Sequence, residues 1–307
     1  MKYYEDLCIL LKKLCHGSAL SEDSYRLEQT QLSKLTSFRT GGPCLALYPL
    51  TEEALICLFT SLKSSHIPMF VLGNGTNVIG RDDGYDGVIL VLTELKAARV
   101  EEDRIIAQCG ASVTAMANLA EKNALSGMEF LYGIPGSVGG AVFMNAGAYG
   151  GECRDILESV TCVTADGTRM TLPAEALNLS YRSSVFQQNG ALILSASFRL
   201  KRGERAEIHA LMEDLMHRRI DKQPLDYPSA GSTFKRCEGR FTAKMIEEAG
   251  LKGYRIGGAM VSEKHAGFVI NFDSAKSQDI FDLIEYIKEQ ILQREGVRIS
   301  CEVRVIE

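Results

Sequence analysis

The clearest candidate for proton or group transfer in this chain is Ser232, which lies in the small and polar segment Pro228–Arg236. A serine hydroxyl can donate a proton or act as a nucleophile, and it can equally cap a helix or stabilise a turn. Ser232 and Lys235 also have the Ser-x-x-Lys spacing of penicillin-binding proteins, which form an acyl-enzyme. Those proteins need Ser-x-Asn and Lys-Thr-Gly elements as well. Neither occurs here, so acyl transfer is not favoured.

Two further segments hold charged groups that could recognise an anionic substrate. Arg182 lies beside an aromatic residue in Tyr181–Ser184 and could bind a carboxylate with two hydrogen bonds, although a surface loop explains it as well. Glu302 and Arg304 are two apart on a strand predicted over 298–306, so both could address one ligand. An exposed ion pair is the alternative. The predicted faces are Ile299, Cys301, Val303 and Val305 on one side and Ser300, Glu302, Arg304 and Ile306 on the other.

Two glycine-rich segments could hold a cofactor that contains phosphate. Gly133–Gly151 has apolar residues between its seven glycines, which favours a buried loop over a solvated linker. Val71–Gly80 resembles Gly-x-Gly-x-x-Gly, but Val78 occupies the third glycine position. Backbone N–H groups in such loops suit a pyrophosphate, whereas tight turns, including an Asn-Gly hairpin at Asn74, are the alternative. Together the two loops predict one extended cofactor that is contacted at two places.

Basic residues and glycines also alternate toward the C-terminus, which suits a diphosphate or nucleotide as well as it suits a solvated charged face. These residues are Lys244, Lys252, Arg255 and Lys264 with Gly253, Gly257, Gly258 and Gly267. The five histidines form no pair with metal-ligand spacing, and no Cys-x-x-Cys occurs among the nine cysteines. We therefore expect no metal site. His265 is interpreted as a structural or substrate-facing residue.

Composition bounds the remaining possibilities. A length of 307 residues suggests two domains, and 46% hydrophobic with 24% charged residues is typical of a globular protein. The net charge of −5 argues against a general nucleic-acid binder. No apolar run approaches the roughly 20 residues that span a bilayer, and the N-terminus lacks a signal-peptide core. We expect a cytoplasmic protein with reduced thiols.

The elements that must position these residues follow from hydrophobic periodicity. A sheet-rich α+β region covers the first two-thirds of the chain and lacks the strand–helix alternation of a Rossmann fold. Its predicted elements are a helix with Leu7, Leu11 and Leu14 on one face, a helix capped by Thr51 with Leu55, Leu58, Phe59 and Leu62 buried, strands at 87–92, 105–109 and 191–200, a helix through Met116, Leu119 and Ala120, and a hairpin of 160–165 with 168–172.

The pattern changes near residue 204. Ile208, Leu211, Met212 and Leu215 predict a buried helix face that ends before Pro224, next to a basic cluster. Thr242 is expected to cap a short helix that Gly250 closes. A long amphipathic helix carries Ile280, Leu283, Ile284, Ile287 and Ile291.

Taken in order along the chain, these blocks resemble the UDP-N-acetylenolpyruvoylglucosamine reductase (MurB) family, which are flavoenzymes of peptidoglycan precursor synthesis. Each block is weak alone, whereas their joint order over nearly the whole chain is specific. The interval of 50 positions from Arg182 to Ser232 is similar to the shorter subgroup, which lacks an extra substrate loop. Cys237 and Met260 depart from the proline and glutamine of the pattern. The matching blocks are Thr36–Pro43, Gly73–Val78, Gly133–Gly151, Tyr181–Ser184, Gly231–Arg236, Ala249–Gly267 and Glu302–Arg304.

The resemblance implies an α+β fold in which a vanillyl-alcohol-oxidase (PCMH)-type FAD-binding region over 1–203 is rejoined by strand 298–307. A smaller α+β substrate-binding domain would cover 204–297. It implies FAD bound without a covalent link, contacted by Arg39, Gly73, Asn74, Gly75, Thr76, Asn77, Val78, Gly110, Gly133, Ile134, Pro135, Gly136, Ser137, Gly139, Gly140, Asn145, Ala146 and Gly147. It implies substrate contacts from Tyr181, Gly231, Lys235, Arg236, Lys264 and Arg304.

The implied reaction passes a hydride from NADPH to FAD and then to the β-carbon of an enolpyruvyl UDP-sugar. Arg182 and Glu302 would stabilise the enolate, and Ser232 would protonate the α-carbon. The resemblance implies a bacterial cytoplasmic monomer with no nucleic-acid or membrane partner. Another FAD-dependent oxidase or dehydrogenase of the same superfamily, and a nucleotide-sugar-binding regulator without turnover, remain the alternatives.

Overall fold

The computed structural model describes residues 3–237 and 239–307, and the chain folds into two compact units. Unit 1 comprises 1–28, 45–74 and 86–218, and unit 2 comprises 29–44, 75–85 and 219–307. The divisions fall inside β1 (Tyr25–Gln31), β2 (Pro43–Pro49) and α7 (Arg205–Lys222). These units have other limits than the expected domains, 1–203 with 298–307 and 204–297, and those domain limits stay a prediction. The start of α7 contributes Ile208 and Met212 to the core of unit 1, and the last strand pairs with residues 78–80, a segment of the first predicted region.

The first sheet of unit 1 has the strand order β1-β2-β5-β3, in which β2, β5 (Val88–Val91) and β3 (Met69–Leu72) run parallel. The predicted helices are confirmed as α1 (Tyr4–His16) and α3 (Glu52–Ser64). Thr51 caps α3, because its Oγ1 accepts a hydrogen bond from the N–H of Ala54 at 3.1 Å. The predicted buried face of α3 is confirmed at Leu55, Leu58, Phe59 and Leu62.

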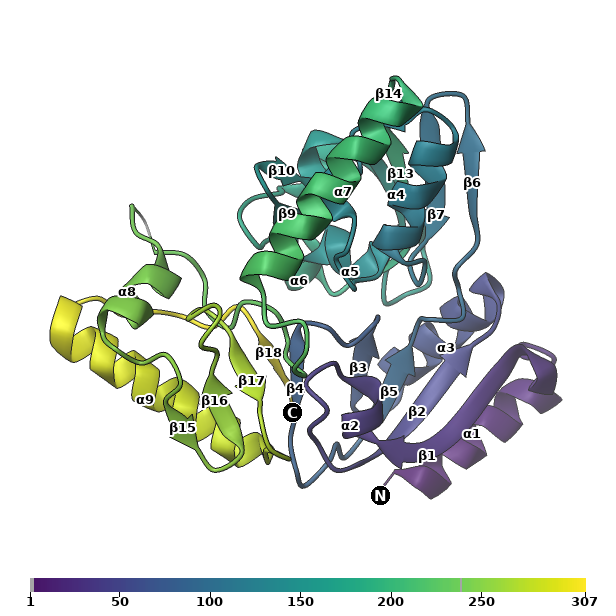
Figure 1. Ribbon diagram of the computed structural model, residues 1–307. Helices are drawn as coiled ribbons and strands as arrows, with labels where there is room; N and C mark the ends of the chain where they lie inside the picture. The colour runs from purple at the N-terminus through teal and green to yellow at the C-terminus, as the bar shows by residue number, and fades with distance from the viewer. Residues whose placement is uncertain (1–2, 238) are drawn as a thin grey trace. The chain divides into compact units, whose positions relative to one another are not determined.

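The second sheet of unit 1 is antiparallel, with the order β12-β11-β13-β7-β6. Alternate residues of β7 and β13 point into the core, where α4 and α5 pack on them (Figure 1). The predicted hairpin of 160–165 with 168–172 is confirmed by the pairing of β11 with β12. The bounds are β6 Ala98–Glu101, β7 Arg104–Gln108, α4 Val113–Lys122, α5 Val138–Phe143, β11 Leu157–Val163, β12 Arg169–Pro173 and β13 Leu192–Arg199.

Short elements connect these layers in unit 1. Strand β14 pairs with β8 and β10 pairs with β9, each in an antiparallel two-stranded ladder. Their bounds are β8 Leu125–Ser126, β9 Gly147–Ala148, β10 Gly151–Glu152, α6 Phe186–Asn189 and β14 Lys201–Arg202.

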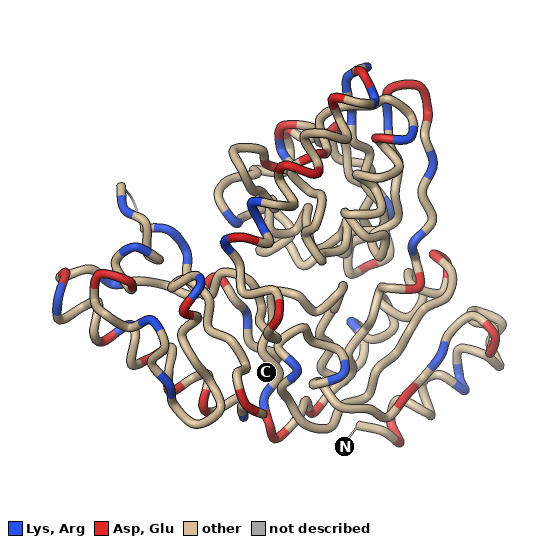
Figure 2. The backbone as a smooth tube through the Cα atoms, in the orientation of Figure 1, with Lys and Arg blue, Asp and Glu red and all other residues tan. Residues whose placement is uncertain are grey.

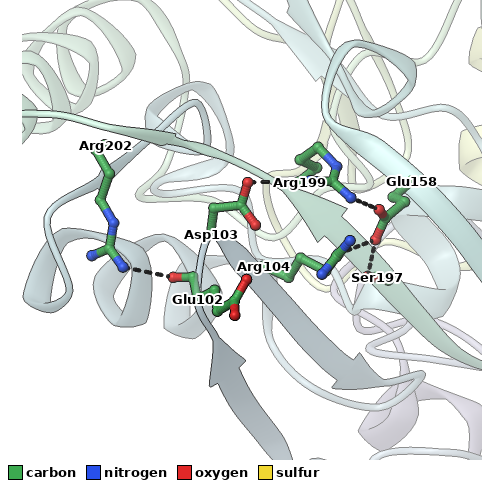
Figure 3. Close-up of polar contacts among 7 residues, drawn as sticks. All are labelled: Glu102, Asp103, Arg104, Glu158, Ser197, Arg199 and Arg202. Atoms are coloured by element: carbon green, nitrogen blue, oxygen red, sulfur yellow. Dashed lines mark hydrogen bonds and ion pairs between the residues drawn. The ribbon is translucent and has the colours of Figure 1, made fainter.

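Acidic and basic residues lie close together along the chain at the β6–β7 turn (Figure 2). Glu158 of β11 is central to this cluster (Figure 3). It accepts hydrogen bonds from Arg104 Nε at 2.7 Å and Ser197 Oγ at 2.9 Å, and it pairs with Arg199. The hydrogen bond from Arg104 is the largest cause that lowers the pKa of Glu158 to about 2. Three strands are therefore cross-linked through one carboxylate.

Unit 2 is built around α9 (Ser277–Glu295), which packs on the antiparallel sheet β15-β16-β17 (Figure 1). The predicted amphipathic helix is confirmed, because Ile280, Leu283, Ile284, Ile287 and Ile291 are all buried. Strand β18 pairs in parallel with β4. The remaining bounds are α2 Leu32–Leu35, β4 Val78–Gly80, α8 Thr242–Glu248, β15 Arg255–Ile256, β16 Ala259–Val261, β17 Val269–Asn271 and β18 Arg304–Ile306.

Three details of the predicted elements were wrong. Leu211 is exposed, because the buried stripe of α7 is narrower than predicted. Thr242 is the first residue of α8 rather than its cap, and its hydroxyl donates to the Lys235 carbonyl at 2.6 Å. The strand predicted over 298–306 is regular only at β18, over 304–306. The segment before it follows a neighbouring loop instead of continuing the parallel ladder with β4.

Across the described ranges 3–237 and 239–307, no helix combines the length and apolar character that crossing a membrane requires.

Candidate functional site

The two glycine-rich loops meet within unit 1. Asn74 of the first loop donates its side-chain amide to the carbonyl of Pro135 in the second loop at 2.9 Å. Gly73 lies against Ser137 so closely that a Cβ at Gly73 would come within 2.2 Å of the Ser137 Oγ. Any larger residue at Gly73 would displace the Ser137 hydroxyl or the loop that carries it. That the two loops serve one ligand stays a prediction.

Ser137 begins α5 and anchors the second loop. Its Oγ accepts a hydrogen bond from the N–H of Gly140 at 3.3 Å. Gly139 donates its N–H to the Cys109 carbonyl at 2.8 Å, and its approach leaves no room for a side chain. Gly110 is packed similarly, since a Cβ there would meet the Leu92 carbonyl oxygen at 1.9 Å. Gly110 and Gly139 are both buried at these close contacts.

The first loop retains unused donors. Among the described residues, the backbone N–H groups of 73–77 have no hydrogen-bond partner. A row of free N–H groups in a glycine turn is the donor set that binds phosphate oxygens. Gly73 and Asn74 belong to unit 1, and Gly75, Thr76 and Asn77 to unit 2. Within unit 1, Gly73 and Asn74 fit the phosphate part of a dinucleotide cofactor, and within unit 2 Gly75, Thr76 and Asn77 offer the same kind of donor.

Asn145 is committed to the loop's own structure. It is 1% exposed and has a left-handed φ of 41°. Its amide nitrogen donates to Glu152 Oε2 at 2.8 Å and to the Ser180 carbonyl at 3.0 Å, while its oxygen accepts from the Arg154 N–H at 3.0 Å. A side-chain contact between Asn145 and FAD therefore stays a prediction, as do contacts from Gly133, Ile134, Gly136, Ala146 and Gly147.

Arg182 projects from a two-residue turn that is fastened to the same glycine-rich segment. Ser180 and Ser183 exchange backbone hydrogen bonds at 3.1 and 3.2 Å, which closes the turn. Arg182 has a φ of 55°, an uncommon conformation for a non-glycine residue and one that indicates strain. Its guanidinium donates to the Gly147 carbonyl at 3.4 Å and lies over the Tyr181 ring at 5.2 Å. A predicted catalytic arginine and predicted cofactor residues therefore lie together in unit 1.

In unit 2, Ser232 and Glu302 lie on adjoining backbone segments. The N–H of Glu302 donates to the Thr233 carbonyl, next to Ser232, at 2.8 Å. The N–H of Lys235 donates to the Ser300 carbonyl at 2.9 Å, so 233–235 and 300–302 form a short antiparallel ladder. This ladder brings together two of the three predicted catalytic residues.

Asn77 joins this ladder to the cofactor loop. Its side-chain amide donates to the Glu302 carbonyl at 3.3 Å, and its own carbonyl accepts from the Arg304 N–H at 3.1 Å. Both backbone polar groups of Glu302 are therefore held. Val78 follows as the buried first residue of β4, opposite Arg304. The predicted cofactor and catalytic residues of unit 2 thus share one connected backbone network.

Residues 36–40 are hydrogen-bonded to Gly75 of the first glycine-rich loop. Ser37 donates its N–H to the Gly75 carbonyl at 3.0 Å and its hydroxyl to the Ser229 carbonyl at 2.6 Å. Arg39 has a φ of 58°, and its side chain is exposed. Ser37 was not predicted as a site residue. The Thr36–Pro43 block pointed to this segment, but the sequence did not show which side chain anchors it.

The predicted substrate residues differ in accessibility. Tyr181, Arg236, Lys264 and Arg304 are exposed, while Gly231 and Lys235 are half-buried. Lys264 donates its ammonium to the Ile220 carbonyl. The two departures from the family pattern have local partners: Arg255 Nε donates to Met260 Sδ at 3.1 Å, and Cys237 Sγ lies 3.6 Å from Thr242 Oγ1. Whether any of these residues binds substrate stays a prediction.

Two surface cavities of about 670 and 560 Å³ lie elsewhere in unit 1, at the start of α3 and over the outer face of the second sheet. None of their lining residues was predicted as a site residue. Within the described part of the chain, no group of three or more His, Cys, Asp or Glu side chains is arranged to hold a metal ion.

Comparison with known proteins shows which family this chain belongs to. Residues 43–173 match the family model described as FAD binding domain, and 223–306 match the C-terminal domain of UDP-N-acetylenolpyruvoylglucosamine reductase. Proteins of that name from Clostridium novyi and Clostridium beijerinckii are 46% and 42% identical to this chain. They cover 90% and 99% of it, and the match spans 90% and 99% of their own length.

A solved structure of the reductase from Thermus caldophilus has a TM-score of 0.80 and 30% identity, covering 92% of this chain and all of that one. The match to the FAD-binding domain confirms FAD as the cofactor and the flavin-binding α+β fold. With both domains matched and the identity sustained over nine-tenths of the length, the chain belongs to the UDP-N-acetylenolpyruvoylglucosamine reductase (MurB) family of FAD-containing oxidoreductases.

Proposed function

We propose that this protein reduces UDP-N-acetylenolpyruvoylglucosamine to UDP-N-acetylmuramate for peptidoglycan synthesis, with NADPH as the electron donor. The proposal rests on the family membership and on one structural observation. The ladder of 233–235 with 300–302 joins Glu302 to Thr233, the residue after Ser232, and the Asn77 side chain joins Glu302 to the first glycine-rich loop. A proton donor, a carboxyl group and a phosphate-binding loop are thus connected within unit 2.

When bound, FAD would supply the two-electron chemistry, as the carrier of a hydride between NADPH and the β-carbon of the enolpyruvyl group. Within unit 1, the free N–H groups of Gly73 and Asn74 would hold its diphosphate. The contact of Gly73 with Ser137 would keep the second loop beside that diphosphate.

Arg182 is proposed to stabilise the negative charge that spreads onto the substrate carboxylate after hydride addition. A guanidinium can donate two hydrogen bonds to that carboxylate in a fixed geometry. The strained turn holds the Arg182 backbone before the substrate arrives, so less ordering is needed during the reaction. Glu302 would raise the energy of an enolate if it were ionised beside it, so we propose that it acts protonated or through a hydrogen-bonded partner such as Arg304.

Ser232 is proposed to protonate the α-carbon. Its O–H bond breaks as the new C–H bond forms, and solvent then returns a proton to the serine oxygen. A hydroxyl is a weak acid, but the dianionic enolate of the substrate carboxylate is a base strong enough to accept its proton. Gly231 precedes it with a φ of 74°, and a Cβ there would meet nothing within 4 Å. Glycine is therefore needed at 231 for its backbone conformation, which directs the chain into Ser232.

The first test is the visible spectrum of the purified protein, followed by NADPH in the absence of air. We expect a yellow protein that bleaches with NADPH and regains its colour with the enolpyruvyl sugar nucleotide. Bleaching that is reversed only by oxygen would refute the substrate and favour a different flavin oxidase. A colourless protein that cannot be reconstituted with FAD would contradict the whole proposal.

We further propose that the enzyme acts as a monomer in the bacterial cytoplasm. The nine cysteines, all of them in the described residues, are free thiols, which suits a reducing compartment. Sedimentation of the purified holoenzyme tests the first point, and fractionation of the source cells tests the second.

A further inference from the structure

The Ser232 backbone depends on its neighbours for its position. Ser232 makes no hydrogen bond with any residue in 3–237 or 239–307. The residue before it is Gly231, the most flexible residue type. The only firm attachment next to Ser232 is therefore the residue that follows it, Thr233.

Thr233 is buried, with 1% of its surface exposed, and it contacts three separate places in unit 2. Its N–H donates to the Gly267 carbonyl at 2.8 Å, and its carbonyl accepts from the Glu302 N–H at 2.8 Å. Its side-chain Oγ1 accepts from the Val269 N–H at 3.0 Å. The peptide group that joins Ser232 to Thr233 is thus oriented by the first bond, and Glu302 is held by the second.

We propose that the Thr233 hydroxyl is a positioning group for proton transfer from Ser232, an inference that rests on the function proposed above. Thr233 is hydrogen-bonded to both Gly267 and Val269, which belong to the same turn. These two bonds fix the Ser232–Thr233 peptide group relative to that turn. The hydroxyl contacts neither the cofactor nor the reacting atoms in this role; it acts through the backbone.

Removing the Thr233 hydroxyl breaks the hydrogen bond with the Val269 N–H. Val269 is 1% exposed, so its N–H would be buried without an acceptor. The turn would shift so that the Val269 N–H reaches another acceptor, and the hydrogen bond from the Thr233 N–H to the Gly267 carbonyl would be lost. The backbone of Ser232 would then no longer be held in place through Thr233. A displacement of about 1 Å at a catalytic group can cost roughly 100-fold in rate. No sequence pattern indicates this role, because a threonine beside a serine is an ordinary pair of residues.

The test is Thr233→Val, which keeps the shape and removes the hydroxyl, measured in the two half-reactions separately by anaerobic stopped flow. We expect bleaching by NADPH within about twofold of the wild-type rate and flavin reoxidation by the enolpyruvyl substrate slowed roughly 10- to 100-fold. The solvent deuterium isotope effect on reoxidation should increase, because proton transfer becomes more rate-limiting. Thr233→Ser, which keeps the hydroxyl, should recover most of the rate.

The matched control is Ser277→Ala. Ser277 is also buried in unit 2, and its Oγ accepts one backbone N–H, from Asp82, at 2.9 Å. This variant loses the same kind of hydrogen bond, and we expect normal reoxidation. If Thr233→Val does not fold, Thr233→Ala compared with Thr233→Ser gives the same contrast.

Wild-type reoxidation in Thr233→Val, or an equal slowing of both half-reactions, would overturn the positioning role while leaving the proposed function intact. A wild-type enzyme that bleaches with NADPH but is not reoxidised by the substrate would overturn the proposed function, and this inference with it.

Discussion

The contact between Gly73 and Ser137 gives the sharpest test of the cofactor cradle. In Gly73→Ala, the new methyl group would be 2.2 Å from the Ser137 Oγ and 3.3 Å from its Cβ. Ordinary contacts begin near 3.4 Å, so either the Ser137 hydroxyl rotates away and loses its hydrogen bond with the Gly140 N–H, or the loops separate by about 1 Å. Overpacking of this kind typically costs about 1–3 kcal/mol of unfolding free energy. Because the first loop carries the free N–H groups, we also expect FAD affinity to fall roughly 10-fold, or about 1.4 kcal/mol.

A double-mutant cycle with Ser137→Ala isolates the clash. Ser137→Ala alone removes the cap of α5 and should cost about 1 kcal/mol. It also removes the oxygen that Gly73→Ala would strike, which leaves only the 3.3 Å contact to Cβ. The double variant should therefore lose less stability than the sum of the two single variants, by about 1–2 kcal/mol.

Urea denaturation of the apoprotein and fluorescence titration with FAD measure these two quantities. Gly136→Ala is the stability control, because its Cβ would meet only Ile134 at an ordinary 3.6 Å. We expect its unfolding free energy to change by no more than about 0.5 kcal/mol. Strict additivity in the cycle, or unchanged stability in Gly73→Ala, would refute the argument that these two residues are in close contact.

Three further outcomes are expected. Ser232→Ala should leave bleaching by NADPH intact and slow reoxidation by the enolpyruvyl substrate about 10²–10⁴-fold, and normal turnover would contradict its assigned role. The pKa of Glu158 falls from 4.5 to about 2 on folding, mainly through Arg104, so it stabilises the protein above pH 4.5 and this contribution is lost as the pH falls toward 2. Because Arg199 in the cluster is 49% exposed, Glu158→Gln should lower the unfolding free energy at pH 7 by only about 1 kcal/mol, as measured by urea denaturation. If the loss of stability below pH 4.5 were the same in Glu158→Gln as in the wild type, the role of Glu158 would be contradicted. Burial lowers the pKa of His265, near Lys252 and Glu247, below 6.5, and its Nδ1 accepts the Gly267 N–H. Just below pH 6.5, His265 therefore binds a proton in the unfolded state but not in the folded state. The unfolding free energy should fall as the pH drops below 6.5, and His265→Gln should remove this pH dependence.

The local features of this protein could be predicted from its residues alone. Thr51 with Glu52 and Glu53 specified where α3 begins, because a cap and the charges of a first turn act over a few residues. The isoleucines and leucine of α9 specified its buried face through their helical spacing. The order of the family blocks similarly specified FAD as the cofactor, since each block carries its glycines and polar residues within a short stretch.

How these pieces join could not be predicted, because it depends on contacts between residues far apart in the chain. The regular part of the predicted last strand begins later than expected. Residues 300–302 pair with 233–235, and only 304–306 pair with β4. It moved Thr242 from a cap into α8, where its hydroxyl reaches Lys235. It also gave Thr233 and Ser37 their anchoring roles. A hydroxyl forms its hydrogen bond with whatever backbone group folding brings near, and nothing in the neighbouring sequence identifies that partner.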